Sequence, residues 1–237
     1  LRAAAPKRTD IRWDKAFDLL DRPDEWVRVR RAQAENTHRV GEEAPFARVD
    51  LGPLAVAAFL GAPLHFAPEE QTSWQDPIID DWDRPPSFAL DESNIWYQRV
   101  LALHRALAKD AAGKYLVCFP DLGGSLDVLA NLRGTERLCT DLYTHREAIR
   151  RAAMDVVDAW ETVHRTLYEI VTSEGAGVVQ WVGAWSEKPY AVPTCDFNAL
   201  IGPADFAAVC LPSLSEQGRR AGRTIFHLDG PDAARHA

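Results

Sequence analysis

A histidine and a carboxylate lie two positions apart near the carboxyl end of the chain, in the segment Ile225-Phe-His-Leu-Asp-Gly-Pro231. Because side chains alternate along a strand, His227 and Asp229 are predicted to face the same side. An imidazole beside a carboxylate can exchange a proton with it, be oriented by it, or bind a metal ion with it. We therefore assign His227 and Asp229 as a candidate catalytic pair and as candidate metal ligands. A buried, satisfied polar pair is the structural alternative.

A second group of polar residues follows closely in Cys195-Asp-Phe-Asn198. Asp196 is a candidate catalytic carboxylate, and Asn198 is a candidate substrate-binding amide. Asp196 could equally hold backbone amides in a turn. Cys195 could be a nucleophile or a ligand, but it is expected to act as a small buried hydrophobe, as most free cysteines do.

Two further carboxylates follow apolar segments that are typical of strands. Asp50 is a candidate substrate-binding residue, and Asp121 is a candidate catalytic residue. The turn Asp121-Leu-Gly-Gly124 contains glycines that let a ligand approach the backbone, and the helix expected after it would favour an anion. The alternative is a tight turn that needs positive φ angles.

Three aromatic residues are candidates for a flat substrate-binding wall. Trp181, Trp185 and Tyr190 could together contact an aromatic or macrocyclic ligand. The alternative is that they pack in the core, as most tryptophans do.

Strands and helices are predicted to alternate along the chain, which favours a parallel α/β fold with both faces of the sheet covered. In such folds the active site lies at the carboxyl ends of the strands. The expected strands are Pro45–Asp50, Tyr115–Phe119, Gly177–Val182, Ala191–Asp196 and Arg223–Asp229. The expected helices are one or two within 10–44, then Leu54–Leu60, 95–113, Ser125–Leu132, Glu147–Thr172 and Pro203–Gly218, and a last one from Gly230. Residues 64–91 are expected to form a long loop.

A (β/α)8 TIM barrel fits this order better than a nucleotide-binding sheet. Neither GxGxxG nor GxxxxGK[ST] occurs in the sequence. About five β/α units are visible where a closed barrel needs eight, so the barrel is expected to be incomplete in this sequence. An open sheet that ends with the sequence is the alternative. We expect covering helices at 1–44 and the partial barrel at 45–237.

Composition excludes several functional classes. The formal charge is −8, with 27 basic and 35 acidic residues, which argues against a nucleic-acid partner or an anionic membrane surface. No apolar run is long enough to cross a bilayer. The four cysteines lack metal-finger spacing and are expected to be reduced in a cytoplasmic protein. Apolar residues exposed on an unfinished barrel would favour a homodimer.

The motifs resemble the uroporphyrinogen decarboxylase superfamily, and more closely its uncharacterised bacterial branch with an HLDGP motif. The resemblance covers about residues 45–237. It rests on Asp121-Leu-Gly-Gly-Ser-Leu-Asp-Val-Leu-Ala-Asn-Leu-Arg-Gly134, Leu138-Cys-Thr-Asp-Leu-Tyr143, Cys195-Asp-Phe-Asn-Ala-Leu-Ile-Gly-Pro-Ala-Asp-Phe206, Ile225-Phe-His-Leu-Asp-Gly-Pro231 and Arg235-His236.

The resemblance implies a (β/α)8 barrel with its ligand at the carboxyl-end face and further residues after the HLDGP motif. The superfamily includes cofactor-free decarboxylases and zinc-dependent methyltransferases that take methyl groups from corrinoid proteins. The decarboxylases carry an RQAGR signature near their start, whereas Arg219-Arg-Ala-Gly-Arg223 lies late in this chain. The zinc enzymes have His-x-Cys where this chain has His227-Leu-Asp229, and oxygen is a harder ligand than thiolate.

Three functions follow as expectations. The first is methyl transfer involving a corrinoid or a methylated small molecule, with zinc as the expected metal and the corrinoid supplied by a partner protein. The second is decarboxylation of uroporphyrinogen or another polycarboxylate without a cofactor, in which Asp121 or Asp50 would stabilise a protonated pyrrole. The third is non-catalytic binding of a tetrapyrrole or another small ligand.

Overall fold

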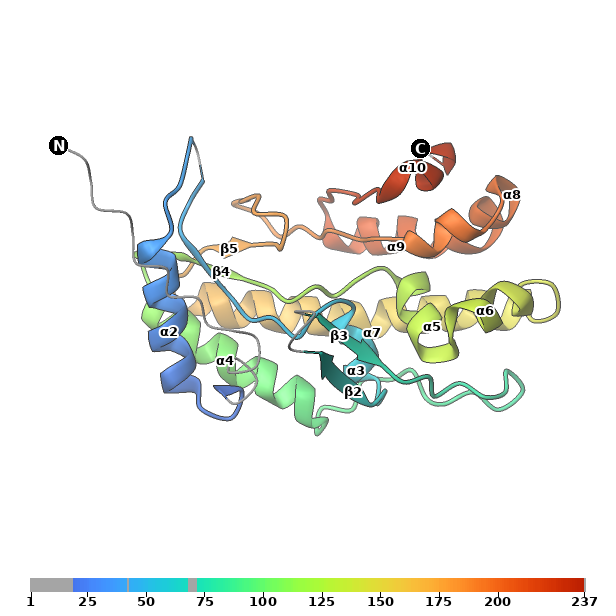
Figure 1. The fold of residues 1–237 in the computed structure, drawn as a ribbon, viewed down its shortest axis with the longest axis horizontal. Coiled ribbons are helices and arrows are strands. Elements are labelled where there is room, and N and C mark those ends of the chain that lie inside the picture. Colours follow the sequence, from blue (N-terminus) through green and yellow to red (C-terminus); the bar gives the residue numbers. More distant parts are fainter. Residues whose placement is uncertain (1–18, 42, 68–71, 237) are drawn as a thin grey trace.

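The structure, a computed structural model, describes residues 19–41, 43–67 and 72–236 and shows an α/β fold (Figure 1). The strands are β1 (Phe46–Arg48), β2 (Leu64–Ala67), β3 (Thr72–Gln75), β4 (Leu116–Cys118) and β5 (Val178–Val179). The longer helices are α2 (Pro23–Asn36), α4 (Ile95–Ala111), α5 (Ser125–Arg133), α6 (Thr135–Asp141), α7 (Arg146–Ser173) and α9 (Leu211–Ala221). The short ones are α3 (Ala55–Phe59), η2 (Asp196–Leu200), α8 (Pro203–Asp205), η3 (Phe206–Cys210), α10 (Gly230–Ala233) and η4 (Ala234–His236).

The described strands β1, β4 and β5 form a parallel sheet in that order. Two later segments run parallel to each other through the bridges Ala191↔Thr224 and Thr194↔His227. Helices connect β1 to β4 and β4 to β5, as parallel pairing requires. The predicted α/β class is therefore confirmed.

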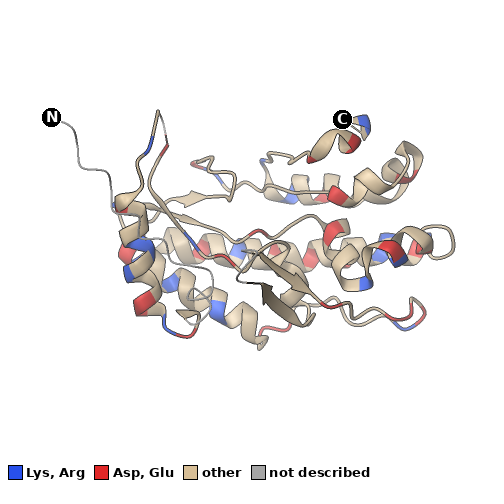
Figure 2. Ribbon diagram, in the orientation of Figure 1, with Lys and Arg blue, Asp and Glu red and all other residues tan. Residues whose placement is uncertain are grey.

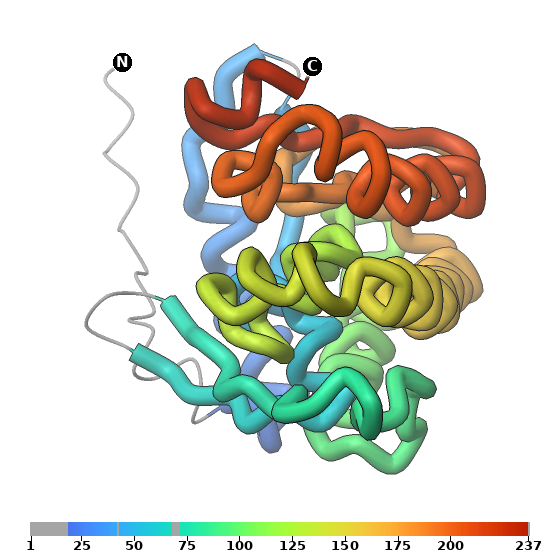
Figure 3. Tube along the Cα trace, turned by 90° about the vertical axis from the view of Figure 1, so that its right-hand side faces the viewer, coloured from blue at the N-terminus to red at the C-terminus, as the bar shows by residue number. Residues whose placement is uncertain are grey.

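One face of the sheet packs on the helices. Ala47, Val117 and Val178 lie on this face and belong to the hydrophobic core. The long helix α7 contacts α4, α5 and α9, and Figure 3 shows it between α4 and α9. Helix α7 forms because apolar residues recur every three or four positions, and that stripe is buried.

On the other face of the sheet, the charged Arg48 stands in a row of otherwise small or apolar side chains. The register places Arg48 beside Cys118 and Cys118 beside Val179, and paired residues of neighbouring strands point to the same side. This row leads directly to the carboxyl ends of the strands, where the candidate residues lie. In a closed barrel such a row would face the interior.

Three predictions about secondary structure need correction. Residues 64–91 are not wholly a loop, because β2 and β3 pair as an antiparallel hairpin. Helix α6 begins directly after Gly134 and was not expected. The predicted helix 203–218 is divided into α8, the π-helical turn η3 and α9. The N-terminal residues Trp13 and Phe17, expected in a covering helix, lie outside the described residues.

The number of β/α units also differs from the prediction. Residues 180–190 form no helix, so the predicted strands 177–182 and 191–196 belong to one unit. Tyr190 connects the two ends of the segment 180–190, because its hydroxyl accepts a hydrogen bond from the Gln180 amide at 2.9 Å. The described residues thus contain four units instead of about five, and within them the sheet does not close. No helix in the described ranges is long and apolar enough to cross a membrane.

Candidate functional site

His227 lies next to Trp181, in the segment predicted as the strand 223–229, which pairs with its neighbour only through isolated bridges at Thr224 and His227. Its backbone amide donates to the carbonyl of Pro193 at 3.1 Å, which fixes its position along the neighbouring segment. The two rings meet edge to face, with centroids 4.9 Å apart. Within the described residues, His227 Nδ1 and Trp181 Nε1 are buried without hydrogen-bond partners. The side chain as a whole is half-buried, and one buried ring nitrogen is left with its hydrogen-bonding capacity unused within the described residues.

Two carboxylates share the surroundings of His227. Burial raises the pKa of the Asp196 carboxyl, the negative charge of Asp229 raises it further, and His227 opposes both. Asp229 precedes α10 at a position where aspartate often caps a helix, yet its side chain makes no cap hydrogen bond. The three side chains therefore form a charged group that can hold and transfer a proton at the strand ends.

A buried carboxylate that sequence reasoning missed supports this group. Asp127, on α5, accepts hydrogen bonds from the Thr194 hydroxyl at 2.6 Å and from the amides of Asp196 and Phe197 at 3.0 and 2.9 Å. Burial nevertheless raises its pKa to about 6. The signal was present in the sequence, because Asp127 stands among residues of α5 that are otherwise buried and mostly apolar.

Asp50 and Asp121 occupy matching turns after β1 and β4. The Gly52 amide donates to Asp50 Oδ1 at 2.9 Å, and the Gly123 amide donates to Asp121 Oδ1 at the same distance. Burial raises the pKa of Asp121, while the Gly123 amide and Arg48 oppose the rise. Each carboxylate thus closes a turn with one oxygen, and Gly123 has a φ of 68°, as the tight-turn alternative for Asp121–Gly124 requires.

Arg48 is a second residue that sequence reasoning missed. Its guanidinium lies 3.5 Å from Asp50 Oδ2 and acts on Asp121. Its Nε is buried without a partner among the described residues. It also faces Cys118, whose thiol pKa burial raises to about 12. No spacing in the sequence indicates this pairing, since it follows from strand register.

Asn198 and Cys195 are both buried within or beside η2. Asn198 Oδ1 has no hydrogen-bond partner in the described part of the chain, and its backbone carbonyl accepts from His236 Nε2 at 2.9 Å. The pKa of the Cys195 thiol is raised by a hydrogen bond with Cys210 and by burial. Cys195 is therefore an unreactive core residue, as expected.

The three aromatic candidates have different surroundings. Trp181 contacts His227. Trp185 is 60% exposed and lies back along β5, where its indole nitrogen is close to Gly177. Tyr190 is buried, with its hydroxyl donating to the Ala184 carbonyl. Trp181 alone stands beside the charged group.

A metal ion does not fit the donors that the structure describes. In those residues, no group of three His, Cys, Asp or Glu side chains is arranged to hold one. His227 and Asp229 supply two donors, and Cys195 is committed to Cys210. A structural or catalytic zinc requires at least three protein ligands, so the described donors do not complete a zinc site.

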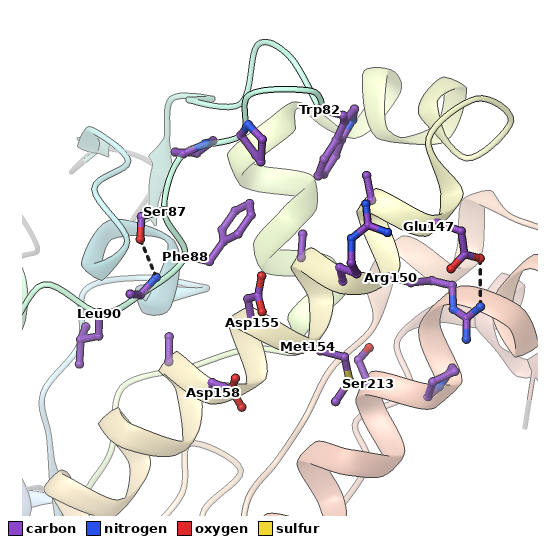
Figure 4. A pocket seen from close by; sticks show the side chains of 18 of the residues that line it. Trp82, Ser87, Phe88, Leu90, Glu147, Arg150, Met154, Asp155, Asp158 and Ser213 are labelled. Atoms are coloured by element: carbon purple, nitrogen blue, oxygen red, sulfur yellow. Dashed lines mark hydrogen bonds and ion pairs between the residues drawn. The ribbon is translucent and has the colours of Figure 1, made fainter.

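A groove of about 1040 Å³ lies elsewhere, between residues 82–92, α7 and the start of α9 (Figure 4). Figure 4 shows Asp155 projecting from α7 toward Phe88. None of the candidate residues lines this groove. It therefore belongs to the helical layer and not to the strand ends.

Comparisons with known proteins find a likeness in structure but not in sequence. No protein-family model matches the chain, and no curated protein matches it. A solved structure described as a methyltransferase from Methanosarcina mazei superposes with a TM-score of 0.62 at 12% identity. The match covers 91% of this chain and 61% of the methyltransferase chain. Over most of its described length, this chain therefore has the fold of part of a methyltransferase.

Proposed function

We propose that the chain is the barrel part of a methyl-transferring enzyme of the uroporphyrinogen decarboxylase type, acting on a corrinoid-bound methyl group or a methylated small molecule. The observation that carries the proposal is the group of His227, Asp196 and Asp229 at the carboxyl ends of parallel strands, where such folds bind their ligands. The likeness to a methyltransferase supports it. The complete (β/α)8 barrel and the division at residue 44 are parts of this proposal.

Methyl transfer needs a base and a shielded position for the acceptor. The methyl group leaves its donor atom without the bonding electrons, which stay on that atom, and bonds to a nucleophile such as a thiol sulfur. The nucleophile loses its proton, and His227 would receive it near the carboxylate of Asp196. Trp181 shields one edge of the imidazole. Asn198, whose Oδ1 has no partner among the described residues, would orient the acceptor.

The test uses ¹³C-labelled methylcobalamin with 2-mercaptoethanol or homocysteine as acceptor, and NMR detection of the thioether. The wild-type chain is expected to form thioether faster than buffer, and His227→Ala is expected to lose about 100-fold or more of that rate. His65→Ala is a matched control, because His65 also pairs with a carboxylate, Asp76, at 2.7 Å on the exposed β2–β3 hairpin. Equal loss in both variants, or no transfer by the wild type, would refute the proposal.

Decarboxylation is the second candidate, and Arg48 favours it. A polycarboxylate needs cationic partners, and Arg48 Nε is buried without a partner in the described residues beside Asp50 and Asp121. Release of CO₂ from uroporphyrinogen that disappears in Arg48→Gln and persists in His227→Ala would replace the first proposal with this one. Binding of uroporphyrinogen without CO₂ release, unchanged in His227→Ala and Asp229→Ala, would indicate a binding protein.

A further inference from the structure

One buried carboxylate connects the helix α5 to both segments that carry the charged group. Asp127 Oδ2 accepts from the Thr194 hydroxyl and the Asp196 amide, and Oδ1 accepts from the Phe197 amide. Thr194 is in turn bridged to His227 on the neighbouring segment. A single side chain thus reaches Asp196 directly and His227 through one residue.

The contact surface around this carboxylate is tight. The Gly124 amide donates to Thr194 Oγ1 at 3.2 Å, and a Cβ added to Gly124 would stand 1.8 Å from the Thr194 carbonyl oxygen. The start of α5 therefore rests on the backbone of Thr194. Thr194 can move only if α5 moves with it, so its hydroxyl has a fixed geometry.

From this geometry we infer that Asp127 and Thr194 act as a positioning latch, which sets the distance between Asp196 and His227. The inference deepens the proposed function, on which it relies only for the chemical roles of Asp196 and His227. Asp127 touches neither reacting group with its own side chain, so it is a positioning residue.

The donors to Asp127 all lie close to the charged group. They belong to Thr194, which is bridged to His227, and to Asp196 and Phe197, the two residues that begin η2. Loss of these hydrogen bonds would therefore act first on the positions of Asp196 and His227.

The test compares three variants at fixed pH through the His227 imidazole resonances in ¹H–¹³C NMR spectra. Thr194→Val removes the hydroxyl at nearly constant volume, and Thr194→Ser restores it. Ser125→Ala is the matched control, because Ser125 is also buried on α5 but bonds to Ser213 at 2.9 Å, away from η2.

The latch predicts that the His227 ring resonances shift in Thr194→Val, return to the wild-type positions in Thr194→Ser, and stay in place in Ser125→Ala. Where methyl transfer is measurable, Thr194→Val is expected to slow it about 10- to 100-fold. Unchanged His227 resonances in a folded Thr194→Val protein would overturn the latch, whether or not the chain transfers methyl groups. Asp127→Asn provides a second test. In this variant the amide resonances of Phe197 and Asp196 and the ring resonances of His227 must all shift.

Discussion

Two histidines of this molecule each contact a tryptophan, yet they have opposite surroundings. His164, on α7, stacks on Trp160 with ring centroids 5.0 Å apart, and its Nε2 bonds the Tyr190 carbonyl at 2.9 Å. Burial lowers its pKa. His227 meets Trp181 edge to face and lies among carboxylates, with Nδ1 free in the described part of the chain.

The difference indicates that the region around His164 serves stability, whereas the region around His227 is suited to chemistry. The helical layer around His164 is apolar, and His104 on α4 lies in it too, with its pKa lowered to about 4 by burial. The strand ends instead gather opposite charges at short range. Figure 2 shows acidic and basic residues interspersed along α2 and α7, so overall charge does not distinguish the two regions. Local geometry does.

The largest expected effect is a difference in the free energy of unfolding between a variant of the helical layer and a variant of the strand ends. Trp160→Ala would remove a buried ring from the helical layer and is expected to lower the free energy of unfolding by about 3–5 kcal/mol. His227→Ala removes a half-buried ring and is expected to change it by less than about 1 kcal/mol. Urea denaturation of both variants measures the two values. Similar losses of unfolding free energy in the two variants would contradict the contrast between the two regions.

The buried His104 should make stability fall in acid. The unfolded chain binds a proton at His104 near pH 6.5, whereas the folded chain binds it only near pH 4. The unfolded state therefore holds more protons between those values, and stability is lost as pH falls through that window, by about 3 kcal/mol. His104→Leu should remove this loss, as urea midpoints at pH 7 and pH 4.5 would show. A loss of the same size in His104→Leu would exclude His104 as its source.

Asp127 should act with the opposite sign over nearly the same range. Its folded pKa of about 6 lies above the unfolded value of 3.8, so the folded state holds more protons between them. Its contribution to stability is full below about pH 4 and is lost as pH rises to about 6, by about 2–3 kcal/mol. Comparing the pH dependence of wild type and Asp127→Asn isolates this term. An increase of stability with pH that Asp127→Asn abolishes would contradict the assignment.

The smallest expected effect is a change in the pKa of Asp196 within the charged group. Asp229→Asn removes a negative charge that raises the pKa of Asp196, so that pKa should move down toward the ordinary aspartate value. Carboxyl ¹³C NMR titration measures it. Asp232→Asn, a substitution three residues later on α10, is the control and should leave the titration unchanged. A pKa of Asp196 that does not respond to Asp229→Asn would mean that the charge of Asp229 does not act on Asp196.

Much of the fold was predictable, because long periodic segments carry a strong signal. The buried stripe of α7 and the apolar segment of β4 follow from spacing alone. The β2–β3 hairpin was not predicted, because its strands are short and lie in a proline-rich stretch. The sequence predicts two separate strands within residues 178–194, because a break in strand pairing has the same sequence pattern as the end of a strand.

The candidate site was predictable only where its residues are neighbours in sequence. Period-two alternation predicts that His227 and Asp229 face the same side, and the strand-end rule selects Asp196 as a further candidate; a shared chemical role of the three stays a prediction. Asp127 was missed because its hydrogen-bond donors lie 67 to 70 residues later in the chain. Arg48 was missed because its partners are set by the register of β1 with β4. Long-range pairing of this kind leaves no spacing signal in a single sequence.

The most direct test of the account follows both histidines while methylcobalamin is added to the wild-type chain. In ¹H–¹³C NMR spectra, the ring resonances of His227 are expected to shift or broaden in a saturable way. Those of His164 should stay unchanged, because its ring is buried against Trp160 and bonded to Tyr190. A response at His164 without one at His227, or no response at either, would contradict the claim that the strand ends bind the methyl donor.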